Sequence, residues 1–118
     1  DSSFPHSRRI NRIVQFVEKN YNRKISLEDV GEQVGMSASS VSRFFKKRTR
    51  HNFWDYLNGF RIDRAAQMMI ETEHTISEIS YACGFNNISN FNRVFRERIG
   101  TTPSDYRNKF KESIIPDR

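Results

Sequence analysis

The chain contains little that could serve a metal, a disulfide or a membrane. Its single cysteine, Cys83, excludes an internal disulfide bond and any zinc site built from cysteines. The three histidines, His6, His51 and His74, are scattered without the spacing of metal ligands. No apolar run approaches membrane-spanning length, and the first residues lack the apolar core of a secretory signal. We therefore expect a cytoplasmic protein with no metal or other cofactor.

Sequence motifs of enzymes are missing as well. The chain has no G-x-S-x-G elbow, no phosphate-binding glycine loop, no HExxH motif and no paired-carboxylate site. Cys83 is a poor candidate nucleophile, because it is predicted on the inner face of a helix with no base or cation to lower its pKa. We interpret it as a small buried apolar residue and expect a protein that is not an enzyme.

What the chain does contain is basic charge and many aromatic side chains. At 118 residues, with 36% hydrophobic content and ten phenylalanines, it can form one modest domain or two very small ones that share a helix. A net charge of +6 and a pI near 9.8 suit a polyanionic partner, although a merely soluble surface is the simpler alternative. Placement favours nucleic acid, because basic residues crowd one predicted helix with no acid between them: Arg43, Lys46, Lys47, Arg48 and Arg50.

Residues 76–107 begin with a helix and a turn. Thr75 and Glu78 have the spacing of a capping box, which predicts a helix from residue 76 to about Cys83. Gly84 can adopt the positive φ that a tight turn between two helices requires. The sequence therefore predicts that the chain reverses direction here and enters a second helix.

The second helix is predicted to begin near Ile88, with Asn86 or Asn87 as its cap. Its apolar residues share one face, and its polar residues point elsewhere. The apolar set is Phe91, Val94 and Phe95, and the polar set is Asn90, Asn92, Arg93 and Arg96. Two helices joined in this way form a helix-turn-helix, whose second helix enters the major groove of DNA.

An earlier stretch repeats the pattern. Shifting the sequence against itself aligns Thr75, Ile76, Ile79, Gly84 and Phe85 with Ser26, Leu27, Val30, Gly35 and Met36. After a one-residue slip in the turn, Arg93, Phe95, Arg96, Asp105 and Tyr106 align with Arg43, Phe45, Lys46, Asp55 and Tyr56. An internal repeat of this length indicates two copies of one supersecondary unit.

In the first copy, Ser26 begins a helix over residues 27–34, Gly35 forms the turn, and Ser37 caps a second helix over residues 38 to about 48. Its inward residues are Val41, Phe44 and Phe45, and its outward residues are Ala38, Ser39, Ser42, Arg43 and Lys46. Arg43 among short side chains suits a bidentate contact to guanine. For Ser39 and Ser42 an ordinary exposed role is equally compatible with the sequence.

The longest predicted helix, from residue 53 to about residue 72, connects the two copies. About eighteen helical residues span roughly 27 Å, which with the flanking helices is comparable to the roughly 34 Å between successive major-groove faces. Two reading helices on one rigid connector could therefore enter adjacent major-groove segments. The site should be asymmetric, because the outward residues of the copies differ. Gly59, in the middle of this helix, indicates either a tight contact or a slight bend.

The expected fold is all-α and homeodomain-like, with about seven helices forming two helix-turn-helix subdomains joined by the long linker helix. Ser7 is predicted to cap the first helix and Pro103 to open the last, and Pro116 is predicted to end the ordered part. The expected segments are a leader or linker over 1–7, the first subdomain over 8–52, the linker helix over 53–72, the second subdomain over 73–112 and a tail over 113–118.

Three segments resemble the duplicated helix-turn-helix domain of the AraC/XylS transcription regulators: YLNGFRIDRAAQMM at 56–69, ISEISYACGF at 76–85 and NFNRVFRERIGTTPSDYR at 90–107. The resemblance covers about residues 8 to 110. It implies a bacterial activator or repressor that contacts RNA polymerase and that usually has a separate effector-binding or dimerisation domain. No such domain lies in these residues, so we expect a fragment or a minimal stand-alone member, and the abrupt start favours a fragment.

The outward residues and the resemblance together suggest which residues contact DNA. The residues expected to face bases are Ser39, Ser42, Arg43, Ile88, Ser89, Asn92 and Arg93. The residues expected to contact phosphates are Ser37, Lys46, Lys47, Asn86, Asn87 and Arg96. Two departures from the family pattern stand out, Gly59 in place of a larger residue and two serines that are poor direct readers. The second copy is therefore expected to discriminate more between sequences.

Two other classes stay open at this point. Some DNA-repair alkyl-transfer proteins resemble this family in part and use a cysteine as the acceptor, which would give Cys83 a chemical role. A helical module that binds protein, with charge serving only solubility, would account for the composition equally well. Binding of random duplex at low salt separates this last class from a DNA-binding domain.

Overall fold

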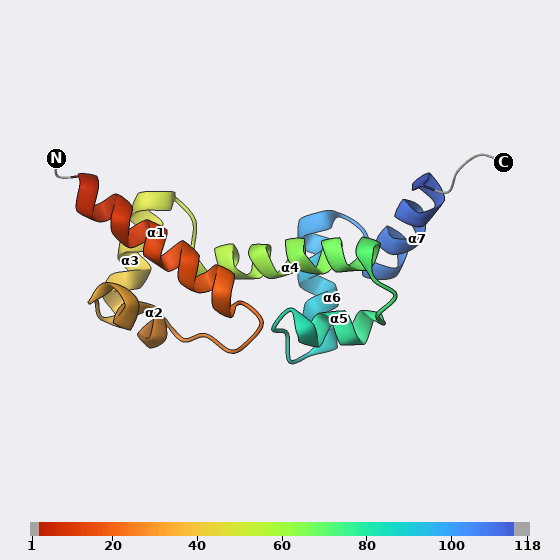
Figure 1. Ribbon diagram of the computed structural model, residues 1–118, viewed down its shortest axis with the longest axis horizontal. Coiled ribbons are helices and arrows are strands. Elements are labelled where there is room, and N and C mark those ends of the chain that lie inside the picture. The colour runs from red at the N-terminus through yellow and green to blue at the C-terminus, as the bar shows by residue number, and fades with distance from the viewer. Residues whose placement is uncertain (1–2, 115–118) are drawn as a thin grey trace. The chain divides into compact units, whose positions relative to one another are not determined.

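The computed structural model describes residues 3–114, with the side chains of residues 7–111, and these residues form seven α-helices and no strand (Figure 1). The expected all-α class and helix number are confirmed for this part of the chain. In order, the helices are α1 (Ser3–Asn20), α2 (Leu27–Val34), α3 (Ala38–Thr49), α4 (Phe53–Glu71), α5 (Ile76–Ala82), α6 (Ile88–Ile99) and α7 (Pro103–Ile114).

The chain divides into two compact units, which we call the first unit (Asp1–Leu57) and the second unit (Asn58–Arg118). The boundary lies inside α4, so the first turn of that helix packs with the first unit and the rest of it with the second. α4 is nevertheless one continuous helix of 19 residues.

In the first unit, helices α1, α2 and α3 pack around a small aromatic core. Phe45 of α3 meets Phe53 edge to face, with ring centroids 5.5 Å apart, and lies 5.4 Å from the ring of Tyr56. Both partners come from the start of α4, which explains why this turn belongs to the first unit. The other fully buried side chains include Ile13, Val17, Val30, Val41 and Leu57.

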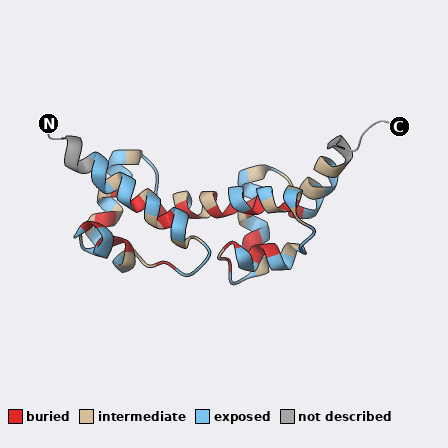
Figure 2. Cartoon of the chain, in the orientation of Figure 1, coloured by how far each residue is buried: buried red, intermediate tan, exposed pale blue. Residues whose placement is uncertain are grey.

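The second unit has a matching core. Phe91 lies 5.2 Å from the ring of Phe85, and Phe95 lies 5.6 Å from the ring of Tyr106. Figure 2 shows buried residues recurring along α4, and those in the second unit include Ile62, Ala65 and Met69. The predicted inward faces are thus confirmed for Phe45, Phe91 and Phe95, whereas Phe44 and Val94 are only half-buried.

One predicted boundary is wrong. α1 begins at Ser3, so Ser7 lies inside the helix and cannot cap it, and residues 3–7 are helical rather than a frayed leader. Proline at position 5 is compatible with this start, because the missing N–H of a proline in the first turn has no intrahelical acceptor there. At the other end, the predicted stop at Pro116 lies outside the described residues.

Gly59 permits a close contact within the second unit. A Cβ at this position would lie 2.9 Å from Nη1 and 3.0 Å from Cζ of Arg98. The Arg98 guanidinium rests on the α4 backbone and donates two hydrogen bonds to Asp63, at 2.9 and 2.8 Å. Of the two sequence interpretations, the structure therefore shows the tight contact. The hydrogen bonds to Asp63 also raise the pKa of Arg98.

A second arginine closes the end of α4. Arg107 of α7 donates to the carbonyl oxygens of Met69, Thr72 and His74 at 3.0, 3.3 and 2.7 Å. The last carbonyls of a helix have no intrahelical partner, so a guanidinium placed there satisfies groups that would otherwise lack a hydrogen bond.

Candidate nucleic-acid interface

The first helix-turn-helix forms as its sequence predicts. Ser26 and Asp29 make a reciprocal capping box at the start of α2, with both hydrogen bonds close to 3 Å. Gly35 ends α2 with φ at 70°, in the left-handed region, and Ser37 then caps α3. These short-range signals fix where α3 begins and therefore which of its residues face outward.

α3 presents a polar and basic outer face. Ser39, Arg43, Lys46 and Lys47 are exposed, and Ser42 is half-buried. Arg43 makes no hydrogen bond or ion pair to any residue that the structure describes. The last turn of α3 adds basic charge, and its first turn contains no acid. A surface of this kind attracts phosphates and leaves a guanidinium available for a base.

The second helix-turn-helix differs from the first in its turn. Thr75 and Glu78 make the expected capping box, and Gly84 has φ at 96°. The cap of α6 is Asn87, so Asn86 is the extra residue of the turn. The one-residue slip predicted between the copies is thus confirmed, and it lies between Gly84 and the cap.

α6 also has an exposed polar face, but its arginine is held. Ser89, Asn92, Arg93 and Arg96 are exposed, and Ile88 is half-buried. Arg93 donates from Nη1 to Oε1 of Glu97 at 2.7 Å and from Nη2 to Oδ1 of Asn90 at 2.6 Å. Sequence interpretation missed Glu97, although its spacing of four residues from Arg93 on a helix was a readable signal.

Two of the predicted phosphate contacts already have a structural role. The Ser37 hydroxyl accepts from the Ser40 backbone N–H at 3.2 Å and donates to the Ser40 hydroxyl at 2.9 Å. The Asn87 side-chain oxygen accepts from the Asn90 backbone N–H at 2.9 Å. Capping uses only the side-chain oxygen of Asn87, so its amide N–H groups can still donate to a phosphate. The Ser37 hydroxyl already donates its proton to Ser40, so it would have to break that hydrogen bond to donate to a phosphate. Lys46, Lys47, Asn86 and Arg96 are all exposed.

The capping carboxylates are electrostatically tuned. A hydrogen bond from the Ser26 backbone, and then one from its hydroxyl, lower the pKa of Asp29. The corresponding bonds from Thr75 lower the pKa of Glu78. Each group therefore holds its negative charge at the positive end of a helix dipole, where that charge is favourable.

Cys83 lies in the interior as expected. It is fully buried, and its thiol faces the Met68 sulfur at 3.7 Å. Burial raises the pKa of the thiol to about 11, despite the opposing effect of Arg64 and Arg61. A buried thiol with a raised pKa is a weak nucleophile at neutral pH.

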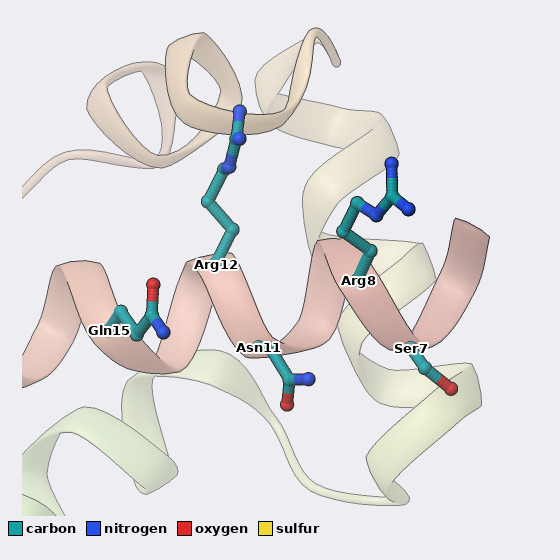
Figure 3. Close-up of a pocket in the computed structure, with 5 residues that line it drawn as sticks. All are labelled: Ser7, Arg8, Asn11, Arg12 and Gln15. Atoms are coloured by element: carbon teal, nitrogen blue, oxygen red, sulfur yellow. The ribbon is translucent and has the colours of Figure 1, made fainter. Parts of the chain in front are cut away.

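A further basic surface lies on α1. Figure 3 shows Arg8 and Arg12 projecting to one side of the helix, while Ser7 and Asn11 point to the other. These residues and Gln15 line an open hollow of about 290 Å³. Arg12 donates to the Gln33 carbonyl oxygen at 3.2 Å, near the end of α2, so its role is at least partly to cap that helix.

Within the described part of the chain, every α-helix falls short of the length or the hydrophobicity that a membrane span requires. Across the same residues, no group of three or more His, Cys, Asp or Glu side chains could hold a metal ion.

The chain resembles known proteins in sequence. A family model described as a helix-turn-helix domain matches residues 30–109. The HTH-type transcriptional activator RhaS of Salmonella schwarzengrund is 28% identical over 107 residues, which make up 91% of this chain and 38% of that protein. The chain therefore spans well under half the length of this relative.

Solved structures are also similar. A transcriptional regulator with an AraC-type DNA-binding domain, from Chromobacterium violaceum, has 27% identity and a TM-score of 0.80, covering 87% of this chain and 92% of that one. The DNA-binding domain of AdpA, solved in complex with a target DNA, has a TM-score of 0.81 at 20% identity and covers 86% of this chain and 92% of that one. This second likeness shows a shared fold alone.

Proposed function

The chain belongs to the AraC/XylS family of helix-turn-helix regulators, and on that premise we propose that it binds double-stranded DNA sequence-specifically and regulates transcription in a bacterium. α3 and α6 are then the two recognition helices. The observation that carries the proposal is that Arg43 and Arg93 occupy matching places in the two copies and are both exposed on their helices.

The outward residues divide by chemistry into two roles. Arginine can pair bidentately with the O6 and N7 atoms of guanine, so Arg43 and Arg93 are the strongest candidates for direct base contact. Lysines such as Lys46 and Lys47 act as point charges toward phosphates and supply affinity without sequence preference. We propose the same roles for the other residues that the sequence assigned to bases and to phosphates. The further base contacts are Ser39, Ser42, Ile88, Ser89 and Asn92, and the further phosphate contacts are Ser37, Asn86, Asn87 and Arg96.

The continuous α4 supports a two-site arrangement on DNA. We propose that the two recognition helices enter adjacent major-groove segments, with α4 as a stiff connector about 28 Å long. The DNA site is then asymmetric, because the outer faces of α3 and α6 carry different residues.

Further proposals rest on the family. They are a contact with RNA polymerase, a companion domain for an effector or for dimerisation, and action in the cytoplasm, where bacterial DNA lies. We also propose that the chain is not an enzyme, and the burial of Cys83 with its raised pKa supports this.

Selection from a pool of random duplexes tests the function. We expect a consensus with two unlike blocks about one helical turn apart, and binding that weakens steeply with salt. Anisotropy with a random duplex at two salt concentrations is the companion measurement. If the chain binds no duplex at low salt, it is a helical module for another partner and the proposal fails.

A further inference from the structure

The Arg93 guanidinium is fixed from both sides along α6. Asn90, one turn before it, accepts from Nη2 at 2.6 Å, and Glu97, one turn after it, accepts from Nη1 at 2.7 Å. The second carboxylate oxygen of Glu97 lies 3.3 Å from the same Nη1. Nε makes no hydrogen bond to any described residue, so part of the guanidinium is still available to a base.

The matching place in α3 has the opposite chemistry. Lys47 stands where α6 has Glu97, and Ser40 stands where α6 has Asn90. Lys47 cannot accept a hydrogen bond from Arg43, and Ser40 is hydrogen-bonded to Ser37. The two arginines therefore differ in their partners: Arg93 has hydrogen-bond acceptors on both sides along α6, while Arg43 has none among the described residues.

We propose that Asn90 and Glu97 are positioning residues for Arg93 and make α6 the discriminating recognition helix, while α3 serves mainly as an electrostatic anchor. This inference rests on the proposed DNA binding. A guanidinium that is already oriented loses less conformational freedom when it pairs with guanine, and it adapts less readily to other bases. In the free protein the Arg93–Glu97 pair is exposed and weak, but the exclusion of water from the groove strengthens it.

Glu97 also acts against wrong partners. A carboxylate beside the base-reading arginine repels phosphates, so α6 gains little from docking in an unrelated sequence. Lys47 does the reverse in α3, where it attracts any phosphate and supports binding regardless of sequence. The exchange of Lys47 in α3 for Glu97 at the matching place in α6 thus separates the two tasks.

Glu97→Gln and Lys47→Gln form a matched pair of variants for the test. Dissociation constants are measured for the selected duplex, for its single-base-pair exchanges and for a random duplex, at two salt concentrations. We expect Glu97→Gln to reduce discrimination about five- to tenfold at one base pair of one block, leaving the other block unchanged. Lys47→Gln should weaken all duplexes alike and reduce the salt slope by about 0.9.

The double variant Arg93→Ala with Glu97→Gln separates positioning from direct contact. If Glu97 orients Arg93, its substitution has no further effect on base discrimination once the arginine is gone, although it still raises affinity for every duplex by removing a negative charge. Additive losses of base discrimination, or an unchanged base-by-base profile for Glu97→Gln, would overturn the inference while leaving the proposed function intact. Failure of the unmodified chain to bind any duplex would instead reject the proposed function. Circular dichroism checks that each exposed substitution leaves the fold in place.

Discussion

Gly31 and Ser80 occupy matching places in the two motifs, and both accept a hydrogen bond from the residue after the turn glycine, at 3.0 and 3.1 Å. At Gly31, an added Cβ would collide with the Met36 carbonyl oxygen and lie 3.5 Å from a Val41 methyl. At Ser80, the hydroxyl is fully buried and has no hydrogen-bond partner among the described residues. At this place, the first unit has no room for a side chain on Gly31, whereas the second unit buries the unpaired hydroxyl of Ser80.

Alanine at these two places should therefore have opposite effects. We expect Gly31→Ala to lower the free energy of unfolding by about 1–3 kcal/mol, because the backbone must shift to admit the methyl group. Ser80→Ala should be neutral or stabilising by up to about 1 kcal/mol, because it removes an unsatisfied hydroxyl. Urea unfolding followed by circular dichroism measures both, and losses of equal size would contradict this account.

Arg93 and Lys46 allow a second residue-scale prediction. Arg93→Ala should cost about 1–3 kcal/mol of binding free energy at one base pair and relax specificity there, while Lys46→Ala should weaken all sequences alike and flatten the salt slope. Footprinting and titrations on specific and random duplexes measure the difference. Equal losses on both kinds of duplex for Arg93→Ala would refute its assignment to a base.

Among the elements, the capping boxes make the starts of α2 and α5 sensitive to acid. The pKa values of Asp29 and Glu78 are lower in the folded chain than their ordinary values of 3.8 and 4.5. Stability from a lowered carboxyl pKa is present above the unfolded value and is lost as the pH falls through the folded value.

We therefore expect the chain to lose stability as the pH falls below about 4.5. Glu78→Gln should be less stable than the natural chain at neutral pH, with a difference that shrinks in acid, because the glutamine has no charge to lose. Thermal melts over a pH series measure this. A difference that stays constant with pH would show that the charge of Glu78 contributes nothing to its cap.

The junction of α4 and α7 depends on one guanidinium. Arg107→Lys keeps the charge but cannot reach three carbonyls in one plane, so we expect a loss of about 1–3 kcal/mol in unfolding free energy. Lys111→Ala is the matched control, because its 3.6 Å ion pair with Glu73 is exposed and should contribute little. Urea unfolding measures the loss in unfolding free energy for both variants. Losses of equal size would reject the role given to Arg107.

The starts of α2 and α5 were readable in the sequence, and long-range contacts were not. Thr75 with Glu78 and Ser26 with Asp29 are signals within four residues, so they fixed the boundaries of α5 and α2. The Arg98–Asp63 and Arg107–Met69 contacts join residues 35 and 38 positions apart, and only packing brings them together. The start of α1 was missed because Pro5 indicates a helix start as readily as a loop.

The candidate site was predictable in its outline. Helical periodicity after a known cap determines which residues of α3 and α6 face outward, and those residues are exposed or half-buried as expected. The capping roles of Ser37 and Asn87 followed from the sequence and are confirmed. The pairing of Arg93 with Asn90 and Glu97 was not foreseen, because it depends on rotamers rather than on spacing alone. Which of these residues touch bases or phosphates stays a prediction.

For the whole molecule, the proposed role of the continuous α4 as a stiff connector gives a prediction about the spacing of the DNA site. Inserting about half a helical turn between the two blocks of the selected site would place them on opposite faces of the duplex. We expect the affinity to fall to that of a single block, because a continuous helix cannot follow the rotation. Inserting a full helical turn between the blocks keeps them on one face of the duplex and therefore tests whether the two units can span a longer distance. Unchanged affinity after the half-turn insertion would mean that the two units dock independently.

The boundary between the two units lies inside α4, and this affects where the chain can be cut into separate fragments. A fragment that stops at residue 52 would lack Phe53 and Leu57, which are buried in the first unit. A fragment that continues to residue 71 would keep them but leave Ile62 and Met69 bare to water. A cut at either end of α4 therefore leaves buried side chains missing or uncovered, and we expect both of these fragments to aggregate unless the uncovered apolar residues are replaced by polar ones.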